Sequence, residues 1–439
     1  MNEDLEIDEN AYDMFFSPLT PWPCLSFDFI LPNSSCYFSE KSKKETNSEL
    51  VNNIPLKYPI DICCVGGTQA NKSELNNIYV IKWSNLNKLK NCETENSSDD
   101  SEYDDEEEND ISLNEHDNME KKKKVKNEFL DEKSNIICKS IKHEYGCINK
   151  IKVSKKINSL VAAWCEDSNV YIYELSDEIK NLDDRGYNEE IEKKPLHVFE
   201  KHSKEGFSLD WNNIYAAKLL TGDNDGNLYL WLPHNSDKWN YEYWDFKKYA
   251  DNKINKKYSI EDIEWCKKGN GLGNVFCICS SDKSIRILDI RNLNNNNNTN
   301  INIENAHEND VNVISWNENS EFLLASGGDD NLIKIWDIRN TRNSVAQLNF
   351  HKQPITSVCW DSKDTYVLLA SSLDNSITIW DLSVESEALE YSHSKYPDQL
   401  LFEHLNQNFI TEAKFHPYFS GVVVSTSCDN FNIFKPCNI

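Results

Sequence analysis

Two stretches of the chain end almost alike: residues 323–340 read LLASGGDDNLIKIWDIRN, and residues 368–383 read LLASSLDNSITIWDLS. In each stretch an aspartate stands six residues before a tryptophan, and a second tryptophan lies twenty residues before the first. The residues concerned are Trp316, Asp330 and Trp336 in the first copy, and Trp360, Asp374 and Trp380 in the second. The two copies are 44 residues apart. The chain therefore contains an internal repeat of defined length.

Five weaker copies can be traced on both sides of this pair. They centre on Trp83; on Asp167 and Tyr173; on Trp211, Asp225 and Trp231; on Trp265, Asp282 and Leu288; and on Phe415, Asp429 and Phe434. Self-similarity at a period of roughly 40 to 45 residues is typical of WD repeats, each of which forms one four-stranded propeller blade. The sequence thus predicts an all-β chain folded as a seven-bladed WD-repeat β-propeller.

The residues within a repeat agree with this prediction. Ile333 and Ile335 alternate with polar residues, as in a strand with one buried face. Asp225, Asp330 and Asp374 fall at tight turns between such runs, where aspartate tolerates the backbone angles required. Their expected role is structural: in WD repeats the turn aspartate joins a His–Ser/Thr–Trp network, and His307 with Trp336 fits it.

Several classes of function are not supported by any motif. The sequence has no Gly-rich phosphate loop, no G-x-S-x-G and no His-Glu-x-x-His. Its fourteen cysteines form no Cys-x-x-Cys pair, so we expect neither a metal nor a cofactor. No run of about eighteen apolar residues predicts a membrane span, and the acidic start MNEDLEIDEN is unlike a signal peptide. We predict a non-enzymatic binding protein without a membrane segment.

Charge is concentrated in one insertion. Residues 93–117 contain thirteen acidic residues and no Lys or Arg, in a chain of net charge −27. Such a stretch cannot bury apolar surface and is expected to be disordered. It is either a solubilising loop or an electrostatic contact for a basic partner. The residues predicted for that contact are Asp99, Asp100, Glu102, Asp104, Asp105, Glu106, Glu107 and Glu108, with Ser97 and Ser101 as possible phosphorylation sites.

A basic cluster follows the acidic run. Lys121, Lys122, Lys123, Lys124 and Lys126 form a candidate nuclear localisation signal. The alternative is a counterweight to the neighbouring acids. A protein with a pI near 4.8 repels phosphate, so direct nucleic-acid binding is not expected. Basic proteins are the natural partners, whether ribosomal proteins or histones.

The segment AYDMFFSPLTPWPCLSFDFI, residues 11–30, resembles the entry segment of the glutamate-rich WD-repeat proteins, which are ribosome-assembly factors related to the histone-binding retinoblastoma-binding WD proteins. Further resemblances are GGTQA at 66–70, EGFSLDW at 205–211, NVISW at 312–316 and the C-terminal VVVSTSCDNFNIFK. The resemblance covers nearly the whole chain. It implies an escort for a large-subunit ribosomal protein, delivering it to pre-ribosomal particles in the nucleus and nucleolus. Histone binding in chromatin assembly is the alternative.

The resemblance also implies how the ring closes. Residues 25–30 would be the outer strand of the last blade, the one that ends at Phe434. Pro18 and Pro21 limit the preceding helix to about two turns, from Asp8 to Phe16. A full histone-H4 groove built on a long N-terminal helix is therefore in doubt. Tyr12, Phe15 and Phe16 are expected to pack on blade edges.

The predicted organisation follows from these segments. Residues 1–21 are an N-terminal segment with a short helix, 22–92 the ring-closing strand and first blade, 93–126 the disordered insertion, and 127–439 blades two to seven. We expect a monomer. A second scaffold hypothesis rests on Trp336, Asp337 and Arg339, a pattern by which some propellers dock onto cullin-type ubiquitin ligases, with 288–291 a near copy.

Overall fold

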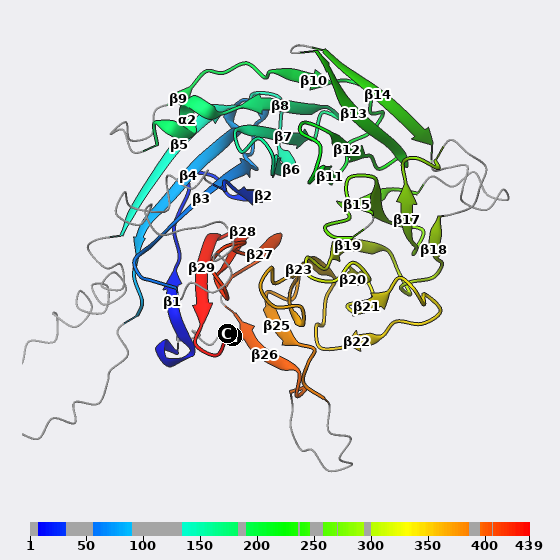
Figure 1. The fold of residues 1–439 in the computed structure, drawn as a ribbon. Helices are drawn as coiled ribbons and strands as arrows, with labels where there is room; N and C mark the ends of the chain where they lie inside the picture. The colour runs from blue at the N-terminus through cyan, green and yellow to red at the C-terminus, as the bar shows by residue number, and fades with distance from the viewer. Residues whose placement is uncertain are drawn as a thin grey trace, which may run out of the picture.

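Seven β-sheets stand around a central axis like the blades of a propeller (Figure 1). The computed structural model describes residues 8–31, 56–89, 134–182, 190–235, 238–245, 258–269, 271–293, 300–385, 396–405 and 407–439. Each of the seven repeats found in the sequence is one sheet, so the predicted seven-bladed propeller is confirmed. None of the described helices is long and apolar enough to cross a membrane.

The strands of each blade follow one another as an antiparallel meander from the channel outward. The first three blades consist of β2 (Cys24–Phe29), β3 (Ile60–Thr68), β4 (Asn77–Leu86), β5 (Asn135–Lys142) and the short β9 (Glu190–Ile191); of β6 (Ile148–Val153), β7 (Leu160–Cys165), β8 (Val170–Glu174) and β10 (His197–Phe199); and of β11 (Ser208–Trp211), β12 (Leu219–Gly222), β13 (Asn227–Asn235) and β14 (Lys238–Asp245).

The remaining four blades follow the same order. They consist of β15 (Ile260–Trp265), β16 (Val275–Ser280), β17 (Ile285–Asp289) and β18 (Ile301–Ile303); of β19 (Val311–Trp316), β20 (Leu323–Gly328), β21 (Ile333–Asp337) and β22 (Ala346–Leu348); of β23 (Ile355–Trp360), β24 (Val367–Ser372), β25 (Ile377–Asp381) and β26 (Leu400–His404); and of β27 (Glu412–Phe415), β28 (Val423–Ser427), β29 (Asn430–Pro436) and β1 (Tyr12–Phe16). The described helical segments are short: η1 (Glu9–Ala11), η4 (Ser73–Leu75) and α2 (Ser176–Lys180).

The ring is closed by β1, and the predicted closing strand at residues 25–30 is wrong. β1 pairs with β29, placing Phe15 opposite Phe434. Residues 24–29 form β2, which pairs with β3 as the innermost strand of the first blade. Its polar side chains explain this place. Ser26 donates to Glu412 at 2.8 Å, and Asp28 accepts from the backbone of Val153 at 2.8 Å. Such bonds link the inner strands of neighbouring blades across the channel wall.

The two helical turns predicted from Asp8 to Phe16 are also wrong. Only Glu9–Ala11 is helical, as one 3₁₀ turn, and Tyr12–Phe16 is a strand. The side chains of Tyr12 and Phe16 are buried, and the Tyr12 hydroxyl lies 2.8 Å from His404 Nδ1. Phe15 packs against the same core cluster. These aromatics are therefore part of the blade edge, as predicted.

The boundary between the first blade and the insertion lies differently from the prediction. β5 comes after the insertion and pairs along its length with β4. The first blade therefore resumes at Asn135, and residues 127–439 do not correspond to blades two to seven alone. The insertion is the connection between the third and fourth strands of the first blade. The predicted disorder of residues 93–126, and the Asn-rich run 294–298, lie outside the described residues.

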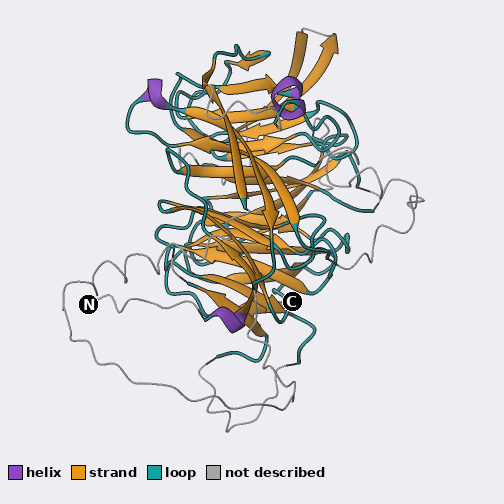
Figure 2. Cartoon of the chain, turned by 90° about the vertical axis from the view of Figure 1, so that its left-hand side faces the viewer, coloured by secondary structure: helices purple, strands orange, loops and turns teal. Residues whose placement is uncertain are grey.

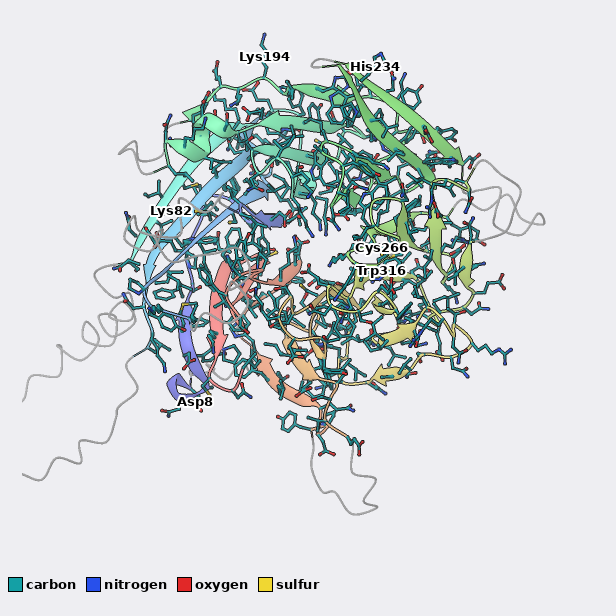
Figure 3. All side chains as sticks on the ribbon, viewed as in Figure 1. Asp8, Lys82, Lys194, His234, Cys266 and Trp316 are labelled. Carbon is teal, nitrogen blue, oxygen red and sulfur yellow. The ribbon has the colours of Figure 1, made fainter. Side chains whose placement is uncertain are left out.

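Side chains fill the spaces between blades (Figure 3). Trp316, labelled there, shares a core cluster with Cys266 and Trp336 between the fourth and fifth blades. Seven clusters of this kind are found among the described residues. Blade follows blade because each sheet buries both of its faces.

The turn aspartates have the structural role predicted for them. His307 Nδ1 lies 2.8 Å from Asp330, its Nε2 lies 2.7 Å from Ser326 Oγ, and the Trp336 indole donates to that hydroxyl at 2.9 Å. His351, Asp374, Thr378 and Trp380 repeat the network in the sixth blade.

The third blade departs in one residue. There the partner of His202 is Asp223, at 3.1 Å, and not Asp225. Asp225 instead accepts from the Ser203 hydroxyl at 3.0 Å.

Candidate protein-interaction face

One end of the disc is formed by the aspartate turns, and we call it the turn face (Figure 2 shows the disc from its edge). In the third blade, Gly222 lies opposite both Ser208 and Leu228, so the start of the inner strand and the turn after the second strand share this end. The same register holds in the other blades. The described turn face consists of residues 17–23, 69–76, 143–147, 166–169, 200–207, 223–226, 258–259, 281–284, 304–310, 329–332, 349–354, 373–376, 405, 407–411 and 428–429.

An arc of exposed apolar side chains lies on this face over the sixth, seventh and first blades. It consists of Leu19, Leu373, Phe409 and Cys428, and we call it the apolar arc. Sequence reasoning missed it. One signal was present: at the turn where the fifth blade has Asp329 before Asp330, the sixth has Leu373 before Asp374.

The opposite side of the same face is acidic. Glu261, Asp310 and Asp329 lie together where the fourth and fifth blades meet. Burial raises the pKa of the Glu261 carboxyl, and Asp310 and Asp329 raise it further. Carboxylates that raise one another's pKa share an unneutralised negative field, which attracts cations.

The wall of the central channel is charged but internally compensated. Glu412 of β27 forms ion pairs with Lys150 of β6 at 2.8 Å and with Lys414 at 3.1 Å. Burial alone would raise the pKa of Glu412, but the two lysines outweigh it and hold that pKa well below its usual range. This network joins strands of the first, second and seventh blades, and we assign it to stability.

Asp262, on the other side of the channel, is less well compensated. Burial raises its pKa to about 6, and the neighbouring Lys150 and Lys152 offset this only in part. Its carboxylate accepts from the backbone of Ile314 at 3.2 Å, a bond that an amide oxygen can replace.

We therefore expect Asp262→Asn to stabilise the protein at pH 8 by about 1 to 2 kcal/mol. A raised carboxyl pKa contributes stability below the unfolded value of 3.8 that is lost as pH rises through about 6. The gain should vanish near pH 4, where wild-type Asp262 is largely protonated in the folded protein. Urea unfolding at both pH values measures it, and an equal effect at pH 4 and pH 8 would contradict the assignment.

The predicted partner-binding and import residues lie outside the described residues. These are Asp99, Asp100, Glu102, Asp104, Asp105, Glu106, Glu107, Glu108, the possible phosphorylation sites Ser97 and Ser101, and Lys121, Lys122, Lys123, Lys124 and Lys126. Their position in the chain is nevertheless set. Ser84 lies opposite Asn135, whereas Asn77 and Lys142 meet at the turn face. The insertion therefore leaves and re-enters the blade at the end opposite the turn face.

The residues predicted for ligase docking lie at the opposite end of the disc, and only part of the set is accessible. Trp336 is buried in the His307 network. Asp337 holds Arg339, whose Nε donates at 2.9 Å, and the guanidinium stacks over the Phe322 ring. Arg291 and Asp289 form the same exposed pair one blade earlier. Docking through Arg339 stays a prediction, whereas Trp336 is not available to a partner.

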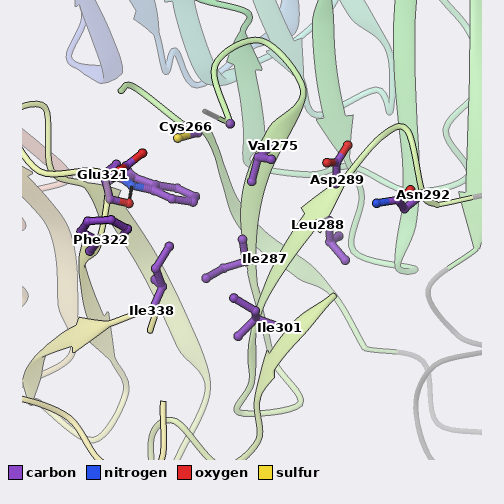
Figure 4. Close-up of a pocket in the computed structure, with 12 residues that line it drawn as sticks. Cys266, Val275, Ile287, Leu288, Asp289, Asn292, Ile301, Glu321, Phe322 and Ile338 are labelled. Atoms are coloured by element: carbon purple, nitrogen blue, oxygen red, sulfur yellow. Dashed lines mark hydrogen bonds between the residues drawn. The ribbon is translucent and has the colours of Figure 1, made fainter. Parts of the chain in front are cut away.

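A pocket of about 240 Å³ lies beside these pairs, between the fourth and fifth blades (Figure 4). Ile287, Ile301, Phe322 and Ile338 form its apolar lining, and Asp289 lies at one side. No group of three metal-ligating side chains is found among the residues that the structure places.

Comparison with known proteins agrees with the fold. The family model of the histone-binding protein RBBP4 and its counterpart in the CAF1 complex matches residues 2–87. The model of the WD domain, G-beta repeat, matches residues 298–337 and 342–381.

Three similar proteins span the whole chain or nearly so. Glutamate-rich WD repeat-containing protein 1 of Dictyostelium discoideum is 34% identical, over 100% of this chain and 83% of its own length. Protein HEAT STRESS TOLERANT DWD 1 of Arabidopsis thaliana is 30% identical, over 100% of this chain and 89% of its own. Ribosome assembly protein rrb1 of Schizosaccharomyces pombe is 30% identical, over 99% and 82%. With these identities over its full length and seven blades in place, the chain belongs to the family of glutamate-rich WD-repeat proteins.

Proposed function

We propose that the chain is a non-enzymatic ribosome-biogenesis factor that escorts a basic large-subunit ribosomal protein to pre-ribosomal particles. The observation that carries this proposal is the placing of charge: thirteen acids lie in one insertion of a complete propeller. A relative of similar length named as a ribosome assembly protein supports the same role. The acids would neutralise a Lys/Arg-rich protein that otherwise aggregates or binds RNA without specificity.

The geometry allows the insertion and the turn face to act on one partner. Ten residues separate Leu89 from Asp99, and ten extended residues reach about 35 Å. A six-residue strand is only about 20 Å long. The acidic run can therefore pass the rim of the disc from the opposite end and reach a protein bound on the turn face.

The histone alternative receives support from one comparison, the family-model match over residues 2–87. Within residues 8–31, however, the helical part is only Glu9–Ala11, and Tyr12–Phe16 is used for ring closure. The described chain thus offers no long N-terminal helix to form one wall of a groove. This favours the ribosomal protein over histone H4, and both belong in the test.

Neutralising the consecutive acids Asp105, Glu106, Glu107 and Glu108 should weaken binding of the ribosomal protein about tenfold at low salt, mainly through slower association. At about 1 M salt, where the Debye length is about 3 Å, the variant and the wild type should bind alike. Phosphate on Ser97 or Ser101 would add about −1.5 to −2 charge each and act in the opposite direction.

The matched control neutralises four exposed acids elsewhere: Asp177, Glu242, Glu385 and Asp398. Association rates of purified large-subunit ribosomal proteins and of core histones are measured across a salt series. Equal loss in both variants would reduce the insertion to general charge. Preference for histones would replace the proposed function by histone escort.

We further propose that the protein acts in the nucleus and nucleolus and that Lys121–Lys124 with Lys126 drive import. Replacing these five lysines by Gln should leave the protein cytosolic while the propeller stays folded. The control replaces the exposed Lys155, Lys156, Lys180 and Lys194. Nuclear accumulation of the five-lysine variant at the wild-type level would make the cluster a charge counterweight. Co-purification with a cullin adaptor, in place of pre-ribosomal proteins, would favour ligase docking.

A further inference from the structure

We infer that the apolar arc binds apolar side chains from the basic segment of the escorted protein and supplies the part of the affinity that salt does not remove. This inference rests on the proposed function for the nature of the partner, and adds the surface and the residues. The acidic insertion and the arc would then be two contacts of different physical kind on one partner.

The arc is the place where the described surface exposes its most accessible large hydrophobics together. Leu19 is 73% exposed, Phe409 62% and Leu373 43%. Leu19 is the most exposed large hydrophobic residue among those described, and Phe409 the most exposed aromatic. Single exposed apolar residues are normal on a protein surface, but a group of them marks an interaction site.

A string of hydrogen bonds shows that the members of the arc are neighbours. The Phe409 amide donates to Asn375 Oδ1 at 2.8 Å, which joins it to the turn that carries Leu373. The Cys428 amide donates to the carbonyl of Asn408 at 3.1 Å. The Thr20 amide donates to Asn430 Oδ1 at 3.0 Å, which brings Leu19 beside the same turn. Residues from four segments of the chain thus form one continuous surface.

Phe409 is held in a conformation that disfavours its own residue type. Its φ is +53°, in the left-handed region, whereas most other non-glycine residues with positive φ in the described chain are small or polar, Asn above all. For a bulky L-residue this costs about 1 kcal/mol or more. Asn408, which donates to Asp429 at 2.7 and 2.8 Å, and Asn375 fix the loop. The fold therefore holds an aromatic ring in solvent where asparagine would be easier to accommodate.

Charge identifies the occupant. Exposed Asp429 borders the arc, and Glu261, Asp310 and Asp329 lie across the mouth of the channel on the same face. These carboxylates repel nucleic acid and anionic lipid surfaces. They attract a protein segment in which lysines or arginines alternate with apolar residues. Such a segment would place its cations near the carboxylates and its apolar side chains on Phe409 and Leu19.

The test uses the full chain with Leu19→Ser and Phe409→Asn combined. Asparagine suits positive φ, so this variant should fold at least as well as the wild type. Val345→Ser is the matched control, because Val345 is 64% exposed and lies in the connection between β21 and β22, at the opposite end of the disc. Binding of purified large-subunit ribosomal proteins and of core histones is measured at low salt and at about 1 M salt.

We expect the double variant to lose about thirtyfold or more in affinity at both salt concentrations, since each buried Leu or Phe contributes about tenfold or more. Val345→Ser should bind like the wild type. Equal affinity of the double variant and the control would overturn the arc, as would loss of all wild-type binding at high salt. If the wild type binds histones and no ribosomal protein, the proposed function fails while the arc is judged on the histone data.

Discussion

Deleting residues 1–16 should turn a stable monomeric propeller into an aggregating protein. The deletion removes β1, which buries Tyr12, Met14 and Phe16 against the last blade. Losing a buried aromatic or methionine side chain costs about 2 to 5 kcal/mol each, and three such losses approach the whole stability of a domain. The deletion also exposes the edge of β29, a template for pairing with another chain.

The control deletes residues 1–7, which leaves β1 intact. Light scattering and thermal unfolding of the two deletions measure the effect. A subtler variant, Met14→Asp, places a charge at a position that is fully buried and should act in the same direction. A soluble, cooperatively unfolding Δ1–16 protein would contradict the assignment of β1 as the closing strand.

Glu412→Gln should destabilise the protein by about 3 to 5 kcal/mol, because it leaves Lys150 and Lys414 without their buried counter-charge. The carboxylate also accepts from Ser26 and from the backbone of Phe27, so its loss loosens the seam between the first and last blades. Asp337→Asn breaks the exposed pair with Arg339 and should cost less than about 1 kcal/mol. Similar costs for the two variants in denaturant unfolding would contradict the network.

The Glu412 effect should depend on pH with a definite sign. A carboxyl whose folded pKa lies below its unfolded value of 4.5 contributes stability above that value and loses it as the pH falls toward the folded pKa. The difference between the wild type and Glu412→Gln should therefore be constant from neutral pH down to about pH 5 and shrink below it. Its sign is opposite to that expected for Asp262.

The blades could be predicted from sequence because their signal is local and repeated. The spacing of Asp330 to Trp336 recurs in four of the other six copies, even where Leu288 or Tyr173 replaces the tryptophan. The His–Ser–Trp network explains this spacing, since its members must meet at one turn. The acidic insertion was equally visible, as composition alone sets its charge.

The ring closure could not be predicted, because two apolar segments competed for one place. Residues 12–16 and 24–29 both alternate as strands do. What separates them is the pairing of β1 with β29 and the reach of Ser26 to Glu412, contacts between residues about 400 positions apart. The same distant pairing overrides the expected helix. The apolar arc was invisible for a similar reason, since its members come from four separate segments.

The pairing of β1 with β29 also fixes the order in which the protein can be assembled. Bringing Phe16 to Ile433 closes a loop of more than 400 residues, and the entropic cost of such closure must be met before any contact at the seam is gained. The seam therefore forms after the intervening blades have folded and shortened the effective loop. Until then the edge of β29 and the aromatics of β1 are unprotected. An escort that shields other chains from aggregation must itself pass through a stage in which it needs shelter.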